Sequence, residues 1–215
     1  MTAGPAIRNG DGADAALAAA AEALCAAGRR LAARGWLEAT SGNLSCRIDG
    51  RRIAVTLSGR EKGALTPADI VAIDGRAPPP AGVSAETPLH LSLYRRVPAV
   101  GAVLHVHSLA ATLASQRAAA EGGIVLEGYE MLKALAGIAT HETSVTLPVF
   151  ANDQDVPALA KRVEARLGHG PGMVGYLLAG HGLYAWGAGI GDAMRHVEAL
   201  DFLLTCELEK ERLFR

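Results

Sequence analysis

The chain has 215 residues, of which half are hydrophobic and a fifth are charged. This composition is typical of a globular protein and excludes a disordered one, and the length fits one domain or at most two small ones. The 21 basic residues nearly cancel the 22 acidic ones, so the net charge is −1. This balance argues against binding to nucleic acid or to an anionic membrane through bulk charge.

Neither a membrane anchor nor a cysteine framework is predicted. No run of 18 apolar residues occurs, so we expect no transmembrane helix. The alanine-rich stretch 15–27 is interrupted by Glu22 and continues into an amphipathic helix, which argues against a signal peptide. The three cysteines are widely spaced and form no CxxC pair. We therefore expect a protein of a reducing compartment, the cytoplasm, without disulfide bonds or thiolate metal sites.

The first 60 residues predict a helix followed by a hairpin. Residues 1–13 lack periodicity, so we expect a flexible tail, with 14–215 forming a single domain. Apolar residues recur on one face over 14–34, which predicts a helix. Asp49-Gly50 is a strong turn signal between two short strand-like runs.

The rest of the chain mixes short strands and helices. The predicted strands are 44–48, 53–57, 70–73, 100–106, 124–126, 145–150, 174–179 and 183–186. The predicted helices after the first are 86–96, 108–117, 155–167 and 190–214. Strict βαβ alternation is missing, and hairpins occur near both ends. We therefore expect one α/β sandwich with a central mixed, largely antiparallel sheet and helices on both faces.

Three histidines form the most specific candidate site. His105 and His107 lie at the end of the strand 100–106, and residues i and i+2 of a strand point to the same face. His181 lies between two glycines, which allow a sharp backbone turn. Three neutral imidazoles with an open fourth position are the ligand set of a catalytic zinc site. The spacing alone leaves another interpretation open, in which one histidine is packed and another is exposed.

Two polar loops are candidates for anion binding. The segments 41–43 and 58–60 offer hydroxyl groups and free backbone N–H groups, which can hold a phosphate. Arg60 or Lys62 could add positive charge. An ordinary turn rich in small residues has the same composition, so each loop alone is a weak signal.

Two carboxylates are candidates for proton transfer. Glu86 lies at a helix start, where it also complements the helix dipole. Glu130 lies in an otherwise apolar neighbourhood, where a carboxylate can be held for chemistry. On these residues alone, a surface position is the commoner outcome for either side chain.

These motifs, in their order along the chain, resemble the class II aldolase/adducin family. The matching segments are Thr40-Ser41-Gly42-Asn43-Leu44-Ser45, Ser58-Gly59-Arg60, Ser84-Ala85-Glu86, His105-Val106-His107-Ser108 and Gly180-His181-Gly182. The resemblance covers about 17–214 and implies the family's α/β/α sandwich. It also implies one zinc ion (Zn2+) per subunit, bound by His105, His107 and His181, and a homotetramer.

Finer features resemble one branch of the family, in the segments 128–131, 152–155 and 181–187. That branch dehydrates 5-methylthioribulose 1-phosphate to 2,3-diketo-5-methylthiopentyl 1-phosphate in methionine salvage. The resemblance implies that Glu130 is the acid/base glutamate. The residues that it implies for holding the substrate phosphate are Asn43, Ser58, Gly59 and Ser84.

Other activities of the family stay open because of Glu86, which occupies the acid/base position of the sugar-phosphate aldolases. The alternatives are a zinc-dependent aldolase of the fuculose or rhamnulose phosphate type and a pentulose-phosphate 4-epimerase. Adducin-type relatives act as structural modules without catalysis, and such a protein should have lost metal ligands. We therefore expect an enzyme whose partner is a small sugar phosphate, and neither nucleic acid nor a membrane.

Overall fold

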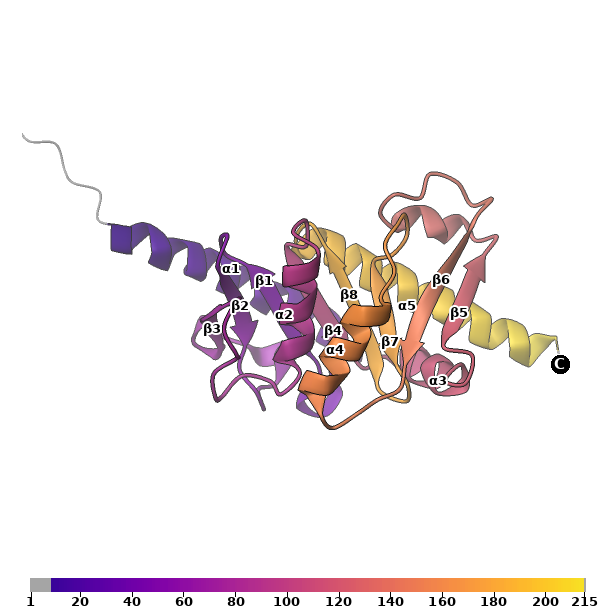
Figure 1. The fold of residues 1–215 in the computed structure, drawn as a ribbon, viewed down its shortest axis with the longest axis horizontal. Coiled ribbons are helices and arrows are strands. Elements are labelled where there is room, and N and C mark those ends of the chain that lie inside the picture. Colours follow the sequence, from indigo (N-terminus) through magenta and orange to yellow (C-terminus); the bar gives the residue numbers. More distant parts are fainter. Residues whose placement is uncertain (1–8, 215) are drawn as a thin grey trace, which may run out of the picture.

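One mixed sheet of eight strands runs through the molecule in the order β3-β2-β1-β4-β8-β7-β6-β5 (Figure 1). The computed structural model describes residues 9–214, with side chains from residue 14 onward. Among the described strands, β6 and β7 are the parallel pair and the other neighbours are antiparallel. The predicted α/β class with a largely antiparallel sheet is confirmed. The strands are β1 (Asn43–Arg47), β2 (Arg52–Thr56), β3 (Ile70–Asp74), β4 (Ala102–Val106), β5 (Gly123–Glu127), β6 (Ser144–Phe150), β7 (Gly175–Leu178) and β8 (Gly182–Gly187).

Helices cover both faces of the sheet, as predicted. The α-helices are α1 (Asn9–Ala32), α2 (Thr87–Arg96), α3 (Leu109–Arg117), α4 (Val156–Arg166) and α5 (Ile190–Leu213). Short 3-10 helices are η1 (Glu38–Thr40), η2 (Lys62–Ala64), η3 (Pro67–Asp69) and η4 (Glu130–Ala134). The first helix begins at Asn9, so 9–13 of the predicted tail are helical, and the rest of that tail, 1–8, lies outside the described residues.

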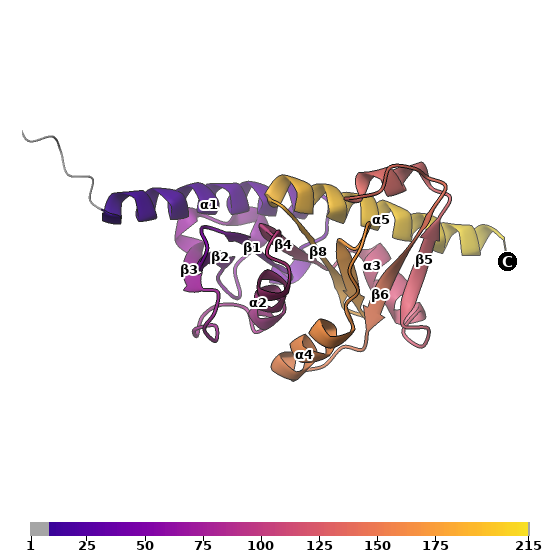
Figure 2. The same ribbon diagram turned by 45° about the horizontal axis from the view of Figure 1, so that its top comes forward.

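Two hydrophobic layers follow from the alternation of side chains along the strands. In β4, Leu104 and Val106 belong to the layer under α1, α3 and α5, whereas Val103 belongs to the layer under α2 and α4. Figure 2 shows α1 and α5 on one side of the sheet and α2 and α4 on the other. His105 follows the same alternation, so its side chain lies on the α2 side.

Local capping explains where two helices begin. The Ser108 hydroxyl accepts a hydrogen bond from the Ala111 N–H at 3.1 Å and caps α3. The Asp155 carboxylate accepts one from the Ala158 N–H at 3.0 Å and caps α4. Such caps satisfy backbone donors that the first helical turn leaves free. Because α3 starts directly after His107 and Ser108, its cap also fixes the chain next to that histidine.

The central strands approach one another closely at the end of β4. Asn43 of β1 and Tyr184 of β8 both pair with His105. A Cβ atom on Gly42 would lie 2.5 Å from the His105 carbonyl oxygen, and one on Gly182 would lie 2.3 Å from the Val106 carbonyl oxygen. Glycine is therefore required at both positions, and the missing side chains leave room for the histidines.

All three cysteines are free thiols, with Cys25 and Cys46 buried in the core. Burial raises the pKa of Cys46 to about 11, so its thiol stays protonated at neutral pH. Within 9–214, no helix combines the length and the apolar character that crossing a lipid bilayer requires.

The two-layer packing predicts that truncating two valines, one buried and one exposed, lowers the free energy of unfolding by different amounts. Val103 in β4 is fully buried, whereas Val125 in β5 is 53% exposed. We expect Val103→Ala to lower the free energy of unfolding by about 2 kcal/mol, through lost burial and the cavity left behind. Val125→Ala should cost less than about 1 kcal/mol. Urea unfolding followed by circular dichroism measures both, and equal losses would contradict the assigned layers.

Candidate metal centre

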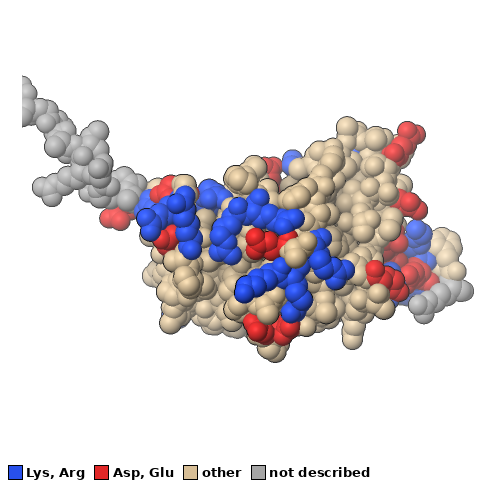
Figure 3. Space-filling view, in the orientation of Figure 1, with Lys and Arg blue, Asp and Glu red and all other residues tan. Residues whose placement is uncertain are grey.

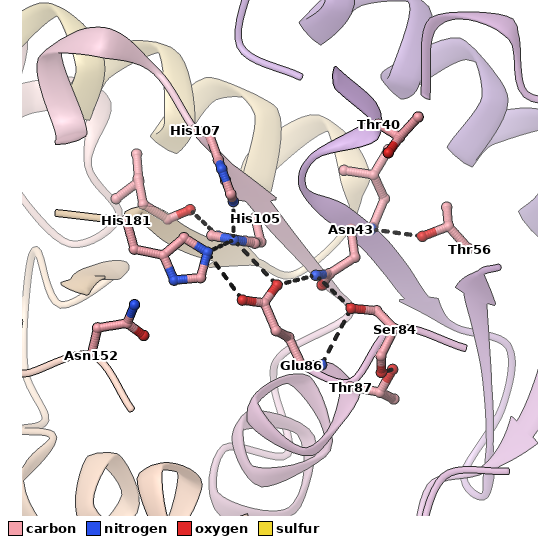
Figure 4. A network of polar contacts seen from close by, with 12 residues as sticks. Thr40, Asn43, Thr56, Ser84, Glu86, Thr87, His105, His107, Asn152 and His181 are labelled. Carbon is pink, nitrogen blue, oxygen red and sulfur yellow. Dashed lines mark hydrogen bonds and ion pairs between the residues drawn. The ribbon is translucent and has the colours of Figure 1, made fainter. Parts of the chain in front are cut away.

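The three predicted histidines converge on one point where β4 ends and β8 begins (Figure 4). The Nε2 atom of His105 lies 2.9 Å from that of His107 and 3.3 Å from that of His181. Tetrahedral zinc with bonds of about 2.1 Å separates its ligand atoms by about 3.4 Å. The three ring nitrogens are therefore spaced to share one divalent metal ion.

The protein fixes the imidazoles in the form that binds metal. The Nδ1 atom of His105 lies 3.1 Å from the Leu183 carbonyl oxygen. A carbonyl only accepts, so Nδ1 carries the proton and the Nε2 lone pair points to the centre. Burial lowers the pKa of His105 well below its usual range. Burial, together with the charge of His181, lowers the pKa of His107 to about 4. Both rings are neutral at pH 7, as a metal ligand must be.

Glu86, the N-cap residue of α2, reaches the same point. Its carboxylate oxygens lie 3.1 Å from His181 Nε2 and 3.4 Å from His105 Nε2. Burial by itself raises the pKa of Glu86, but the neighbouring imidazoles, above all His105, outweigh it and hold that pKa below its usual range. An ionised carboxylate at this place can act as a fourth ligand or as a base.

Asn43 and Ser84 belong to the same network. The Asn43 Nδ2 donates to a Glu86 carboxylate oxygen at 2.7 Å and lies 3.2 Å from the Ser84 hydroxyl oxygen. Ser58 and Gly59 are exposed and lie beside the segment before Ser84, because the Ser58 N–H donates to the Gly82 carbonyl. The structure thus joins two of the four predicted phosphate-binding residues to the histidines and places the other two in the adjacent loop.

The loop before Asn43 is strained and is held by a buried lysine. Ala39 and Thr40 adopt positive φ angles of 52° and 63°, which costs a non-glycine residue about 1–3 kcal/mol. Lys62 is 2% exposed, and its Nζ donates to the carbonyls of Thr40 at 2.7 Å and Arg60 at 2.8 Å. Burial lowers the pKa of Lys62, and the charge of Glu86 opposes this change. A lysine in a polar loop carries no signal of burial, so the sequence did not predict this role.

Glu130 lies at the opposite end of the sheet. The histidine end includes Leu178 of β7 and, paired with it, Phe150 at the end of β6. The chain between β5 and β6 leaves the sheet at the other end, where Glu127 pairs with Ser144, and η4 belongs to this connection. The Glu130 carboxylate is exposed and forms ion pairs with the side chains of Lys133 and His141. Its assignment as the acid/base residue stays a prediction.

Comparison of the sequence and the fold with those of known proteins identifies the family of this chain. Residues 22–208 match the family described as Class II Aldolase and Adducin N-terminal domain. The chain belongs to this family. The resemblance that the ordered motifs predicted is thereby confirmed, and the three histidines lie in two of those motifs, His-Val-His and Gly-His-Gly.

Curated relatives are more than 50% identical to this family member over the aligned residues. A methylthioribulose-1-phosphate dehydratase of Methylococcus capsulatus is 52% identical over 186 residues, which cover 86% of this chain and 90% of that protein. One of a Bradyrhizobium species is 54% identical over 198 residues, covering 90% and 92%. The crystal structure of the L-fuculose-1-phosphate aldolase from Thermus thermophilus is 26% identical, with a TM-score of 0.74, and covers 92% of this chain and 97% of that chain. The class II aldolase fold is confirmed.

A buried polar chain behind the metal centre was not predicted from the sequence. The Ser45 hydroxyl lies 2.7 Å from His90 Nδ1 and 2.9 Å from the Tyr94 hydroxyl. His90 packs edge-on against Tyr184, whose ring stacks on His105 at 3.9 Å. His90 has no metal-ligand spacing to the other histidines. The only sequence feature that could have linked it to the site is its position four residues after Glu86, which places both residues on the same helix face.

His90 should make the stability of this class II aldolase domain pH-dependent. Burial lowers the pKa of His90 to about 4, below its value of about 6.5 in an unfolded chain. As the pH falls from 6.5 toward 4, the unfolded state binds the proton first, so stability is lost. We expect His90 to account for about 2 kcal/mol of the loss between pH 7.5 and 5.

Urea unfolding of the metal-free wild type and of His90→Gln at both pH values measures this contribution. The variant keeps a polar group near Ser45 but cannot titrate, so its loss between the two pH values should be smaller by that amount. Identical losses in the two proteins would show that His90 is not buried in the neutral form.

Proposed function

We propose that the protein is a hydro-lyase that converts 5-methylthioribulose 1-phosphate to 2,3-diketo-5-methylthiopentyl 1-phosphate in methionine salvage, in the cytoplasm. One observation carries the proposal. Three imidazoles and the ionised Glu86 meet at one point, in a chain whose relatives at more than 50% identity are named methylthioribulose-1-phosphate dehydratase. The free cysteines accord with a reducing compartment.

We infer that His105, His107 and His181 bind one zinc ion per subunit. The spacing of the Nε2 atoms, the neutral rings of His105 and His107 and the fixed tautomer of His105 support this ligand set. The bound ion would act as a Lewis acid that draws electrons from the substrate carbonyl at C2 and so acidifies the proton on C3.

The side chains around the ion supply proton transfer and orientation. The reaction removes the proton from C3, breaks the C4–O bond so that water leaves, and turns the resulting enol into the C3 ketone. Glu86 is ionised and can accept the C3 proton, because its carboxylate lies at the metal centre. Asn43 orients that carboxylate through a 2.7 Å hydrogen bond. Asn43, Ser84 and the Ser58-Gly59 loop hold the substrate phosphate in this proposal, which aligns the reacting carbons.

Glu130 can take part only from another copy of the chain, because it lies at the far end of its own sheet. We propose a homotetramer in which it does so. Two exposed apolar regions support association. Leu109, two residues after His107, is 74% exposed. Near Glu130, Met131 and Phe202 line an almost wholly apolar hollow and are 37% and 48% exposed. Exposed apolar clusters of this kind mark interfaces.

A sugar-phosphate aldolase is the second candidate, and the position of Glu86 favours it. That carboxylate contacts the histidine cluster directly, as an aldolase acid/base would, and the fold matches the L-fuculose-1-phosphate aldolase from Thermus thermophilus. Incubation with dihydroxyacetone phosphate and an aldehyde separates the two functions, since only an aldolase condenses them. An epimerase would interconvert two pentulose phosphates without loss of water.

Turnover and metal content, measured on one sample, test the dehydratase. We expect diketone formation from 5-methylthioribulose 1-phosphate with about one zinc per chain. His107→Ala removes a ligand and should lose both the metal and at least about 100-fold in rate. The variant His169→Gln, at an exposed histidine outside the cluster, serves as the control and should keep both metal and turnover. Full turnover by metal-free His107→Ala would refute the mechanism, and zinc without turnover would move the proposal to the aldolase.

Mixing two inactive variants tests where the acid/base group comes from. If Glu130 acts across subunits, Glu130→Gln and His107→Ala are each inactive, and tetramers reassembled from an equal mixture should regain activity at about one quarter of their sites. Glu142→Gln, a nearby exposed glutamate, should behave as wild type. If Glu86 acts alone, Glu130→Gln keeps its activity and Glu86→Gln loses it.

A further inference from the structure

A concave and strongly basic surface lies at the end of β1 that points away from the histidines. It is a cavity of about 570 Å³ between the β1–β2 turn, the end of β3 and the C-terminal end of α2. We call it the arginine groove, after its charged lining residues Arg47, Arg51, Arg76 and Arg95. Figure 3 shows Lys and Arg side chains gathered over this part of the molecule. Within the described chain, no aspartate or glutamate lines the groove.

Arg47 is fixed in place before any ligand arrives. Its Nε donates to the Val100 carbonyl and its Nη2 to the Tyr94 carbonyl, both at 3.1 Å. Its guanidinium also lies 5.1 Å from the centre of the Tyr94 ring. A guanidinium carries about five N–H donors, so further donors remain for other partners. Pre-organised in this way, Arg47 would lose little side-chain entropy on binding an anion.

The positive charges of the groove are mostly uncompensated. Arg51 donates to the Asp74 carboxylate through Nε at 2.9 Å and Nη2 at 2.6 Å. In the part of the chain that the structure describes, no carboxylate forms an ion pair with the guanidinium groups of the other three arginines. The groove therefore gathers a surplus of about three positive charges, although the whole chain has a net charge of −1. Such local repulsion is relieved when a multivalent anion binds.

We propose that the arginine groove binds a small molecule that carries two or more linked phosphate groups. Arginine forks recognise phosphate oxygens in pairs, and the surplus charge matches that of a di- or triphosphate. The cavity has the volume of a small-molecule site. A nucleic acid would need a basic track that continues beyond one confined hollow.

The groove is a separate site from the proposed catalytic centre. Arg47 ends β1 at the groove, whereas Asn43 begins β1 at the histidines, and a strand of this length separates its ends by about 13 Å. A single phosphate held near Asn43 and Ser84 therefore cannot reach these arginines. Anion binding in the groove therefore does not depend on whether the protein catalyses the dehydratase reaction.

Calorimetric titration with inorganic tripolyphosphate tests the groove at a fixed ionic strength of about 0.15 M, where surface charges are screened beyond about 8 Å. We expect one tripolyphosphate per chain, bound at least tenfold more tightly than orthophosphate. The double variant R76Q/R95Q should weaken tripolyphosphate binding at least tenfold. Both arginines are exposed and form no ion pair in the described chain, so the variant should fold and keep wild-type dehydratase turnover.

A second double variant controls for net charge. R29Q/R195Q removes the same charge from exposed positions on α1 and α5, outside the groove, and should change the affinity less than twofold. Equal weakening by both variants, or none by R76Q/R95Q, would overturn the proposal. So would a short single-stranded oligonucleotide that binds more tightly than tripolyphosphate and depends on Arg76 and Arg95, since the groove would then belong to a nucleic-acid surface.

Discussion

A row of polar contacts between β1 and α2, which we call the polar seam, is the interaction on which both the histidine cluster and the arginine groove depend. Its members are Asn43, Ser45 and Arg47 on β1 and Glu86, His90 and Tyr94 along α2. Alternate residues of a strand repeat about every 6.6 Å, and every fourth residue of a helix repeats about every 6 Å. The two spacings nearly match, so successive polar side chains meet in pairs. The first pair delivers the Glu86 carboxylate to the histidines.

The histidine cluster depends equally on strand register. A slip of one residue between β4 and β8 would turn His105 away from Tyr184 and from the imidazole of His181, because strand side chains alternate. Gly42 and Gly182 allow the neighbouring backbones to close on β4. The meeting of His181 with His105 and His107, from two distant segments of the sequence, is therefore a property of the whole sheet, and not of either motif alone.

Stability is given up around this centre. The neutral rings of His105 and His107, the ionised Glu86 and the ammonium of Lys62 are largely shielded from water. Among the described residues, no lysine or arginine forms an ion pair with Glu86, and no carboxylate forms one with Lys62. Two non-glycine residues adopt left-handed backbone conformations in the adjacent loop. Each feature costs free energy that a purely structural core would avoid. Their concentration at one end of the sheet is typical of a functional site, and ligand binding would recover part of that cost.

The sequence predicted the helices and strands better than it predicted which side chains come into contact. His105 and His107 followed from the strand period of two, and the order of five short motifs pointed to the family. The place of Glu130 depends on the order of the strands, which no local pattern contains, so its distance from the histidines could not be read from the chain. Lys62 lies in a polar segment of a kind that usually faces solvent, and His90 lies between Leu89 and Leu91, where the local pattern does not mark it as buried. The packing of η2 and α2 buries the two side chains.

The seam also explains why the acidic Glu86 lies at one end of β1 while the other end stays basic. Ser45 in its middle bonds both His90 and Tyr94, so a polar cluster lies within an otherwise apolar layer. Sliding α2 along β1 would break these two buried hydrogen bonds, and each is expensive to leave unmade. Arg47 and Glu86 therefore hold opposite charges at opposite ends of β1, and the fold keeps them apart. Had the seam been apolar, α2 would lose these polar contacts with β1, and Glu86 would lose the Asn43 hydrogen bond that orients its carboxylate beside the imidazoles.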